Sequence, residues 1–439
     1  MHVHAEVKDA RVEDGRGVVE IAIRCENSTG VTVGPGVVEV VLPRREGRRM
    51  SADRTAVIAG LGLTEFGRIY GRTPADFAIE AIAGAAEDAG LALPDIDGLL
   101  VNPGVGNDID LRLQSALQMR DTRVLATIQS FGSSAGQMVQ YASMAIASGM
   151  ADVVACVYAD APLKEGKSAG ASYAARSARC GVSARCPAAA GLKAAPERYA
   201  VAARRHMNAF GTTSEQFGAV AVAARQWAAM NPRAQKREPI TLADHQDSRM
   251  IADPLRLLDC CLVSNGAVAV ILTSADRAAA LRRPPVHVWG WGQAHPGYAN
   301  RRGSEFGLVT GAARSGADAL KMAGVGVGDI DVREIYDCFT YTTLVTLEDY
   351  GFCAKGEGGD FVASGAIAPG GSHPTNTGGG ELSSYYMWGM TPLSEAIIQA
   401  RGDGGERQVP NHDLIMVSGN GGVLDFHSTL VLSPHPKSA

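Results

Sequence analysis

The first 50 residues carry strand-like hydrophobic runs and no helical pattern. Apolar runs at 18–25 and 37–43 are separated by turn-rich segments, and a further extended segment precedes them. Three strands without a helix bury too little surface to form a core alone. The polar linker that follows ends in Met50. We expect residues 1–49 to be a β-rich appendage, or a segment that lies upstream of a true start at Met50.

From residue 55 onward the pattern changes to buried strands that alternate with alanine-rich helices. The first series is expected to place strands at 56–62, 96–101 and 153–158 and helices at 75–89 and 132–148. The second is expected to place strands at 286–292, 333–337, 414–422 and 429–433 and helices at 311–323, 342–350 and 393–399. This alternation indicates an α/β fold with helices on both faces of a sheet. We interpret the series as two halves, residues 50–284 and 285–439.

A stretch of loops and helices interrupts the first half at about residues 160–250. It opens with a small, polar segment, and hydrophobic periodicity then predicts amphipathic helices at 199–210 and 214–230. Asn231 ends the second helix, because a residue that precedes a proline avoids helical geometry. An apolar run at 267–272 then returns the chain to the core as a strand.

Composition excludes several classes of protein. Of the 439 residues, 46% are hydrophobic and 20% are charged, which argues against a disordered chain. The formal net charge of −5 gives no basic excess for binding nucleic acid. The sequence has no run of about 18 apolar residues and no signal-peptide layout, so we expect a cytoplasmic protein. Its eight cysteines form no C-x-x-C pair, so we expect reduced thiols and no metal site.

A glycine-rich loop at 370–380 carries the first candidate chemistry. It places His373, Asn376 and Thr377 among five glycines. Glycine lets the backbone approach a ligand closely, so backbone N–H groups and an imidazole could meet a substrate there. Taken alone, the loop fits an ordinary turn with a solvated histidine better than a site. Its significance therefore depends on motifs elsewhere in the chain.

Four landmarks occur in the order that one enzyme superfamily shows. They are a helix-opening glycine, a Tyr-Asp-Cys-Phe box, the histidine loop and a Ser-Gly-Asn-Gly-Gly segment, at Gly132, 336–339, 370–380 and 418–422. Over about residues 52–435 the chain resembles the thiolase superfamily, and residues 248–256 are similar to its sterol-carrier-protein-like branch. The resemblance implies duplicated βαβαβαββ halves in five αβαβα layers, a dimer, and a CoA thioester as ligand. Residues 1–49 resemble the last strands of a hot-dog-fold hydratase.

The departures from a thiolase concern its two reactive cysteines. Gly132 stands where the resemblance places the nucleophilic cysteine at the start of a helix. The second, acid/base cysteine falls near Ser418, whose hydroxyl is a far weaker acid than a thiol. A chain without both cysteines cannot form an acyl-enzyme, although it can keep a thioester pocket and an oxyanion hole.

With these departures the chain resembles the thiolase-like aldolases of bacterial steroid side-chain degradation, which cleave a β-hydroxyacyl-CoA. That resemblance implies Tyr336 and Tyr386 as a catalytic base and acid, with their order left open, and His373 as an oxyanion donor. It also implies a small OB-fold, zinc-ribbon partner in a heterotetramer and no permanently bound cofactor. The remaining candidates for substrate or oxyanion contacts are Gly132, Ser133, Asn376, Thr377, Ser418 and Gly421.

Two other functions remain open from the sequence. The hydratase-like appendage is compatible with a non-catalytic CoA-thioester-binding subunit of an acyl-CoA complex. A thiolase or acyl transferase would need another nucleophile, for which Cys338 and Cys353 are the candidates. The geometry around the glycine-rich loop distinguishes these alternatives from an aldolase.

Overall fold

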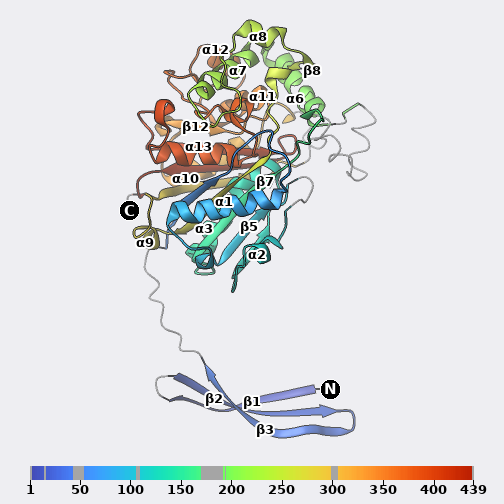
Figure 1. Cartoon of the computed structure of the whole chain (residues 1–439), viewed down its shortest axis with the longest axis vertical. Helices are drawn as coiled ribbons and strands as arrows, with labels where there is room; N and C mark the ends of the chain where they lie inside the picture. Colours follow the sequence, from blue (N-terminus) through green and yellow to red (C-terminus); the bar gives the residue numbers. More distant parts are fainter. Residues whose placement is uncertain are drawn as a thin grey trace. The chain divides into compact units, whose positions relative to one another are not determined.

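The computed structural model describes residues 2–13, 16–42, 54–104, 109–169, 191–192, 194–297 and 305–437. Its contacts divide the chain into two units, Met1–Ala52 and Asp53–Ala439. The first unit is an antiparallel sheet of β1 (His2–Glu13), β2 (Arg16–Asn27) and β3 (Gly30–Leu42) (Figure 1). The three expected strands are present, and each extends beyond the segment that predicted it.

This small sheet has an apolar face and a charged face. A register shift between Val7 and Asp9 moves Asp9 and Arg11 to the face opposite Val3 and Val7. Arg11 forms ion pairs with Asp9 and Glu13 on the charged face. Val3 and Val7 are 63% and 61% exposed, so the unit buries little of its own apolar surface.

The first half of the second unit has the predicted βαβαβαββ order. Its elements are β4 (Ala56–Leu63), α1 (Pro74–Ala89), β5 (Gly98–Asn102), α2 (Leu113–Ala116), β6 (Val124–Thr127), α3 (Ser134–Ala147), β7 (Val153–Asp160) and β10 (Gly266–Ser274). Local signals set the ends of α1: Thr73 caps its first turn by accepting from the Asp76 N–H, and Gly90 ends it with a left-handed φ of 74°.

The second half repeats this order, except that one strand is shortened to a single bridge. Its elements are β11 (Val286–Ala294), α10 (Ala312–Ala323), β12 (Val332–Ile335), α11 (Thr340–Tyr350), α12 (Gly358–Ala363), α13 (Met390–Ala400), β13 (Ile415–Gly421) and β14 (Phe426–Ser433). The strand equivalent to β6 is replaced by a single parallel bridge between Arg333 and Thr375. The histidine loop therefore occupies the edge of this half of the sheet.

All nine strands of the two halves form one sheet, in the order β12-β13-β14-β11-β4-β10-β7-β5-β6. The halves join where β4 and β11 pair antiparallel, with Ile58 opposite Val286. Counted outward from this junction, the strands of the two halves follow the same relative order. A pseudo-twofold axis between the halves produces this arrangement. The sequence predicted two halves but not that their sheets would be continuous.

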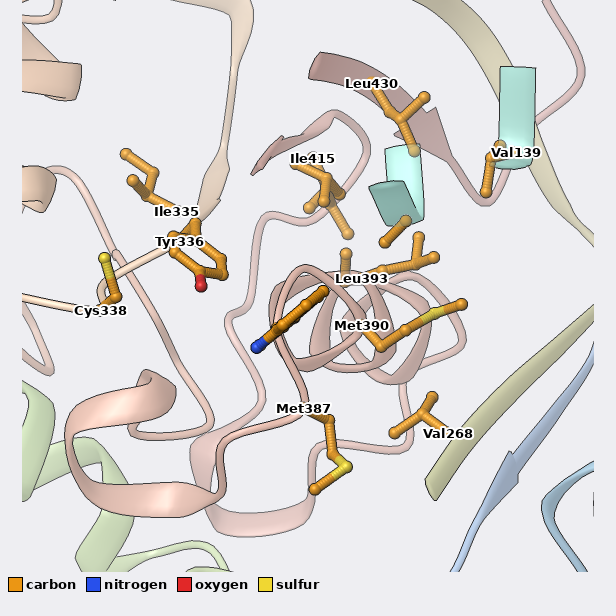
Figure 2. Packing of buried hydrophobic residues seen from close by; sticks show 14 of the residues in the cluster. Val139, Val268, Ile335, Tyr336, Cys338, Met387, Met390, Leu393, Ile415 and Leu430 are labelled. Atoms are coloured by element: carbon orange, nitrogen blue, oxygen red, sulfur yellow. The ribbon is translucent and has the colours of Figure 1, made fainter. Parts of the chain in front are cut away.

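The helices form layers around the two halves of the sheet. α1 packs on one face of the first half and α10 on the outer face of the second (Figure 1). α3 and α13 contact strands of both halves and each other, so they form the central layer. Figure 2 shows apolar side chains from these elements in one cluster, among them Val139, Leu393 and Leu430. The α/β fold with αβαβα layers is thus confirmed.

The insertion follows β7 and precedes β10. It contains α6 (Ala195–Phe210), α7 (Ser214–Ala229), α8 (Leu242–Asp247) and the short hairpin of β8 (Met250–Ala252) and β9 (Leu255–Arg256). Both predicted helices are present, and α7 packs against α11 and α12 of the second half. Much of the small, polar segment expected before α6 lies outside the described residues. No helix in the described ranges is long and apolar enough to cross a membrane.

Candidate active site

The two central helices start at nearly the same point, and their starts have the same local form. The turns before α3 and α13 contain Phe131-Gly132 and Trp388-Gly389, and the two aromatic residues have positive φ angles of 54° and 50°. Their rings lie 5.7 Å apart. A Cβ added to Gly389 would overlap the backbone oxygen of Gly132, so glycine is what permits this approach. The pseudo-twofold relation therefore brings two equivalent turns together.

Tyr336 reaches this point from the end of β12. Its backbone N–H donates to the Ser418 carbonyl on β13 over 3.0 Å, and its side chain is 3% exposed. Figure 2 shows the ring close to Ile335 and Cys338. The strand expected at 333–337 ends at Ile335, which is a correction: Tyr336 already lies in the connection to α11, where the chain turns.

Tyr386 reaches the same point from the segment that precedes α13. Its backbone N–H donates to Ser264 Oγ over 3.0 Å, and that oxygen also accepts from the Gln235 amide over 2.6 Å. Tyr386 is half-buried, and its hydroxyl lies 3.1 Å from the hydroxyl of Tyr336, where either can be the donor. The structure thus joins the two tyrosines that the motifs singled out.

Gly132 lies directly under the ring of Tyr336. A Cβ added to Gly132 would lie 2.5 Å from Tyr336 Cζ, and closer still to Cε2 and to the backbone oxygen of Asn420. No side chain fits at this position while Tyr336 keeps its place. The space that a nucleophilic cysteine would need is therefore filled by a phenol from the other half of the chain.

Burial controls the ionisation of Tyr336. Burial raises the pKa of its hydroxyl well above the ordinary value of 10, and the neighbouring Glu381 and Cys338 raise it further. A phenolate at this position is therefore disfavoured near neutral pH. Any proton transfer through Tyr336 must leave the phenol without a lasting negative charge.

Ser133, Ser418 and Gly421 support the site through contacts of their own. The Ser133 N–H donates to Ser130 O over 3.1 Å, so this amide is engaged within the turn. Ser418 Oγ lies 3.0 Å from Nε2 of the buried His427, and its carbonyl accepts from Tyr336. A Cβ on Gly421 would overlap the Ser130 oxygen. These three residues shape the turn and hold Tyr336 in place.

His373 lies away from the tyrosine pair. The parallel bridge between Arg333 and Thr375 places His373 beside the start of β12, about five residues or 16 Å along the strand from Tyr336. Its Nδ1 lies 2.8 Å from Ser372 Oγ, and its ring packs on Phe361 with centroids 5.0 Å apart. Burial and the charge of Arg333 lower its pKa. The structure therefore does not bring this expected oxyanion donor to the tyrosines.

Asn376 and Thr377 fasten the glycine-rich loop to β12. Asn376 Oδ1 accepts from the Ile335 N–H over 2.7 Å. Thr377 donates through Oγ1 to Glu334 over 2.7 Å and approaches Glu395 at 3.2 Å. Both side chains are buried, and these hydrogen bonds hold the loop in position.

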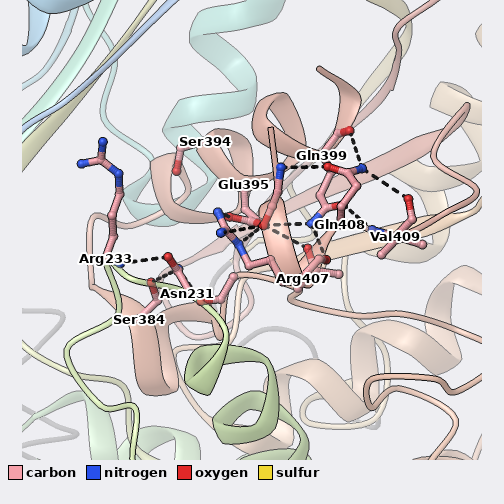
Figure 3. A network of polar contacts seen from close by, with 12 residues as sticks. Asn231, Arg233, Ser384, Ser394, Glu395, Gln399, Arg407, Gln408 and Val409 are labelled. Atoms are coloured by element: carbon pink, nitrogen blue, oxygen red, sulfur yellow. Dashed lines mark hydrogen bonds and ion pairs between the residues drawn. The ribbon is translucent and has the colours of Figure 1, made fainter. Parts of the chain in front are cut away.

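A buried ion pair closes the network behind this loop. Arg407 Nε lies 2.8 Å from Glu395 Oε1, and Gln399 Nε2 lies 3.1 Å from the same oxygen (Figure 3). On the other side, Asn231 donates to the Gly378 carbonyl over 2.8 Å. The polar groups thus hold the backbone that carries Tyr386 from two directions.

The site contains two buried carboxyl groups, Asp337 and Glu381, for which the sequence predicted no role. Asp337 accepts a hydrogen bond from the Glu381 N–H over 2.7 Å. Burial raises the pKa of Asp337 to about 7, although the hydrogen bonds from Glu381 and Leu382 lower it. Burial and Asp337 together raise the pKa of Glu381 well above its ordinary value. One signal was available: between Phe361 and Ser394, Glu381 is the only Asp, Glu, Lys or Arg.

The two candidate cysteine nucleophiles are poorly placed for that role. Burial raises the pKa of Cys338 well above its ordinary value, and it raises the pKa of Cys353 to about 12. A reactive cysteine needs the opposite shift, because the thiolate is the nucleophile. Among the residues that the structure describes, no group of His, Cys, Asp and Glu side chains could hold a metal ion.

Comparison with known proteins agrees with this geometry. Residues 292–434 match the family model described as thiolase C-terminal domain-like. A steroid side-chain-cleaving aldolase of Thermomonospora curvata is 36% identical over 375 residues, which cover 83% of this chain and 95% of that protein. A 17-hydroxy-3-oxo-4-pregnene-20-carboxyl-CoA lyase of Mycobacterium tuberculosis is 38% identical over 361 residues, covering 79% and 92%.

A solved structure gives the same result for the fold. The Ltp2-ChsH2(DUF35) aldolase superposes with a TM-score of 0.79 at 34% sequence identity, and the match covers 87% of this chain and 98% of that one. Full-length similarity at this identity, together with the duplicated halves and the central helices α3 and α13, places the chain in a family. The chain belongs to the thiolase superfamily, in its sterol-carrier-protein-like aldolase branch.

Proposed function

We propose that this protein is a carbon–carbon lyase that cleaves a β-hydroxyacyl-CoA by a retro-aldol reaction, giving a ketone and a shorter acyl-CoA. The observation that carries the proposal is the 3.1 Å contact between the hydroxyls of Tyr336 and Tyr386, above a glycine where a thiolase has its nucleophile. Acyl transfer through a covalent intermediate has no nucleophile at this point. Two hydroxyls at this distance can, in contrast, pass a proton from one to the other.

A retro-aldol reaction moves one proton from the β-hydroxyl oxygen to Cα. One tyrosine oxygen takes the proton of the alcohol as the Cα–Cβ bond breaks, and its own proton passes to the second tyrosine. The second tyrosine delivers its proton to Cα of the thioester enolate. Both phenols are protonated at the start and at the end of the reaction, so neither holds a negative charge. This relay is compatible with the raised pKa of Tyr336, and which tyrosine faces the alcohol is left open.

The developing enolate needs a hydrogen-bond donor. Gly132 opens the turn that leads into α3, directly beside the tyrosine pair. Backbone N–H groups at the start of a helix are suited to negative charge. We assign this role to the Gly132 amide, since the Ser133 amide already donates to Ser130.

For the substrate we propose a CoA thioester of a steroid with a shortened side chain. Two relatives have names that describe steroid or pregnene substrates. Around Gly132 the chain offers flat apolar surfaces for a ring system: Phe131 is 38% exposed and lies 6.3 Å from Phe426 and 5.7 Å from Trp388. Aromatic faces of this kind bury ring carbons effectively. No permanently bound cofactor is part of the proposal.

For the assembly we propose a homodimer in complex with a DUF35 protein, the small OB-fold and zinc-ribbon partner that the resemblance implies. The solved relative is named as an aldolase with a DUF35 component. β6 is the edge strand of the nine-stranded sheet, and Leu125 on it is 37% exposed. Tyr141 and Met144 of α3 are 40% and 46% exposed. We propose that this edge forms the contact between two copies of the chain. We also propose that the protein works in the cytoplasm.

The test is cleavage of a 3-hydroxyacyl-CoA that carries a tertiary alcohol, with products identified by mass, for the protein alone and with a DUF35 partner. Tyr336→Phe and Tyr386→Phe should each lower kcat by about 10²–10⁴, the contribution of one proton-transfer group. Wild-type rates in both variants would refute the mechanism. Tight CoA-thioester binding without turnover by any complex would favour a non-catalytic subunit.

A further inference from the structure

Glu381 lies beside Tyr336, and none of the contacts described so far gives its carboxyl group a role. It is fully buried, and neither of its carboxyl oxygens has a hydrogen-bond partner among the described residues. Its backbone, in contrast, is fixed on both sides: its N–H donates to Asp337 over 2.7 Å and its carbonyl accepts from Leu262 over 2.9 Å. A buried, unpaired carboxyl group is costly. A rigid backbone that keeps it there indicates a function.

The groups around Glu381 are acidic or neutral. Tyr336, Asp337 and Cys338 face it from the connection after β12, and Cys261 faces it from the loop before β10. No described cation offsets a charge on it.

The nearest helix of the insertion does supply an arginine, but this arginine is used elsewhere. Arg225 of α7 donates to Ser383 Oγ over 3.0 Å and to the Glu238 carbonyl over 2.9 Å. In these surroundings burial and the proximity of Asp337 both raise the pKa of Glu381, which favours its neutral form.

We infer that Glu381 is a positioning residue for the tyrosine relay: its neutral form leaves the Tyr336 hydroxyl paired with Tyr386, and its ionisation breaks this pairing and sets the alkaline limit of activity. The inference rests on the proposed lyase function. A carboxylate is a stronger hydrogen-bond acceptor than a phenol oxygen. Ionised Glu381 would therefore draw the Tyr336 proton away from Tyr386 and interrupt the relay.

The local backbone is consistent with this role. Glu381 lies in a single π-helical turn, Gly380–Ser384, and the two residues before Glu381, Gly379 and Gly380, have φ angles of 96° and 59°. A Cβ on Gly380 would overlap the Asp337 carboxylate. π-helical turns are rare and frequent at functional sites. The turn directs Glu381 into the protein interior five residues before Tyr386.

The first measurement is the pH dependence of kcat for wild type, Glu381→Gln and Glu381→Met. In wild type, kcat should fall about tenfold per pH unit above the ionisation of Glu381, as a single proton is lost. Both variants are neutral at every pH, so they should lose this alkaline limb and keep neutral-pH kcat within about threefold. Glu334→Gln is the matched control, since Glu334 is also buried but contacts Thr377; it should keep the alkaline limb.

The second measurement does not depend on turnover. The infrared difference between wild type and Glu381→Gln at neutral pH should contain the carbonyl band of a protonated carboxylic acid, and this band should disappear on alkaline titration. The same band should persist in Tyr336→Phe. If no variant and no wild-type preparation turns over a substrate, the proposed function fails while this measurement still decides the protonation of Glu381.

Three results would overturn the inference. The first is a wild-type alkaline limb retained in folded Glu381→Gln and Glu381→Met. The second is the absence of a protonated-carboxyl band assigned to Glu381. The third is loss of kcat at all pH values in both folded variants, which would make Glu381 a proton donor in its own right.

Discussion

Adding a single methyl group at Gly132 tests the central contact of the site. In Gly132→Ala the new Cβ would lie 2.5 Å from Tyr336 Cζ and would also overlap the Asn420 backbone oxygen. The tyrosine ring could shift, but the backbone oxygen is fixed in β13. Overpacking of this kind costs about 1–3 kcal/mol, and the Asn420 contact puts Gly132→Ala at the upper end, about 3 kcal/mol.

The same change should damage catalysis more than stability. Relief of the clash moves the Tyr336 ring away from Gly132 and so changes its 3.1 Å contact with Tyr386. A displacement of about 1 Å in a reacting group can lower a rate about 10²-fold. We expect kcat to fall by about this factor with little change in substrate affinity.

Chemical denaturation and steady-state kinetics measure both effects. Gly328→Ala is the control, because a Cβ there meets nothing within 4 Å and the residue has no positive φ; it should match wild type. In a double-mutant cycle, Gly132→Ala should destabilise the Tyr336→Ala background less than it destabilises wild type, and the double variant should have no activity. Wild-type stability and kcat in Gly132→Ala would show that the tyrosine ring does not occupy this space.

Three further predictions test neighbouring features. Cys338 should resist iodoacetamide in the folded protein, because burial raises its thiol pKa, and rapid selective labelling would contradict this. Folding raises the pKa of Asp337 from 3.8 to about 7, so the protonated form of this residue stabilises the fold. This stabilisation is complete below about pH 3.8 and is lost as the pH rises through 7. The stability of wild type relative to Asp337→Asn should therefore decline over that range, and a pH-independent difference in unfolding free energy would refute it. His373→Ala should change kcat by less than about threefold, because His373 lies at the other end of β12; a loss of about 10²–10³, typical of an oxyanion donor, would reverse our placement.

The order of helices and strands was readable from the sequence because each half repeats short buried strands and amphipathic helices. Runs such as 153–158 and 286–292 appear as β7 and β11 with small changes at their ends. The pairing of β4 with β11 was not readable, because the hydrophobic pattern of a strand shows which of its faces is buried but not which strand lies beside it. The reduced third strand of the second half was hidden for a similar reason, since a single bridge at Thr375 leaves no hydrophobic pattern.

The candidate site, too, was only partly predictable from the sequence. Tyr336 and Tyr386 were found as motif residues, but their contact depends on two turns that the pseudo-twofold axis brings together. His373 was expected beside them because glycine-rich loops often approach ligands. The parallel bridge of its loop with β12 instead fixes it at the opposite end of the strand. Sequence spacing alone does not tell which end of a strand a loop residue will reach.

The sequence by itself determined that this chain has two α/β halves, that both thiolase cysteines are missing and that two tyrosine-bearing motifs remain. These are properties of residue identity and local periodicity. Only the tertiary structure decided that the Tyr336 ring fills the space above Gly132, and that the Glu381 carboxyl group is buried beside it with no hydrogen-bond partner among the described residues. Both facts arise from close packing between segments about 200 and 45 residues apart along the chain, and packing at that range is decided by the whole fold.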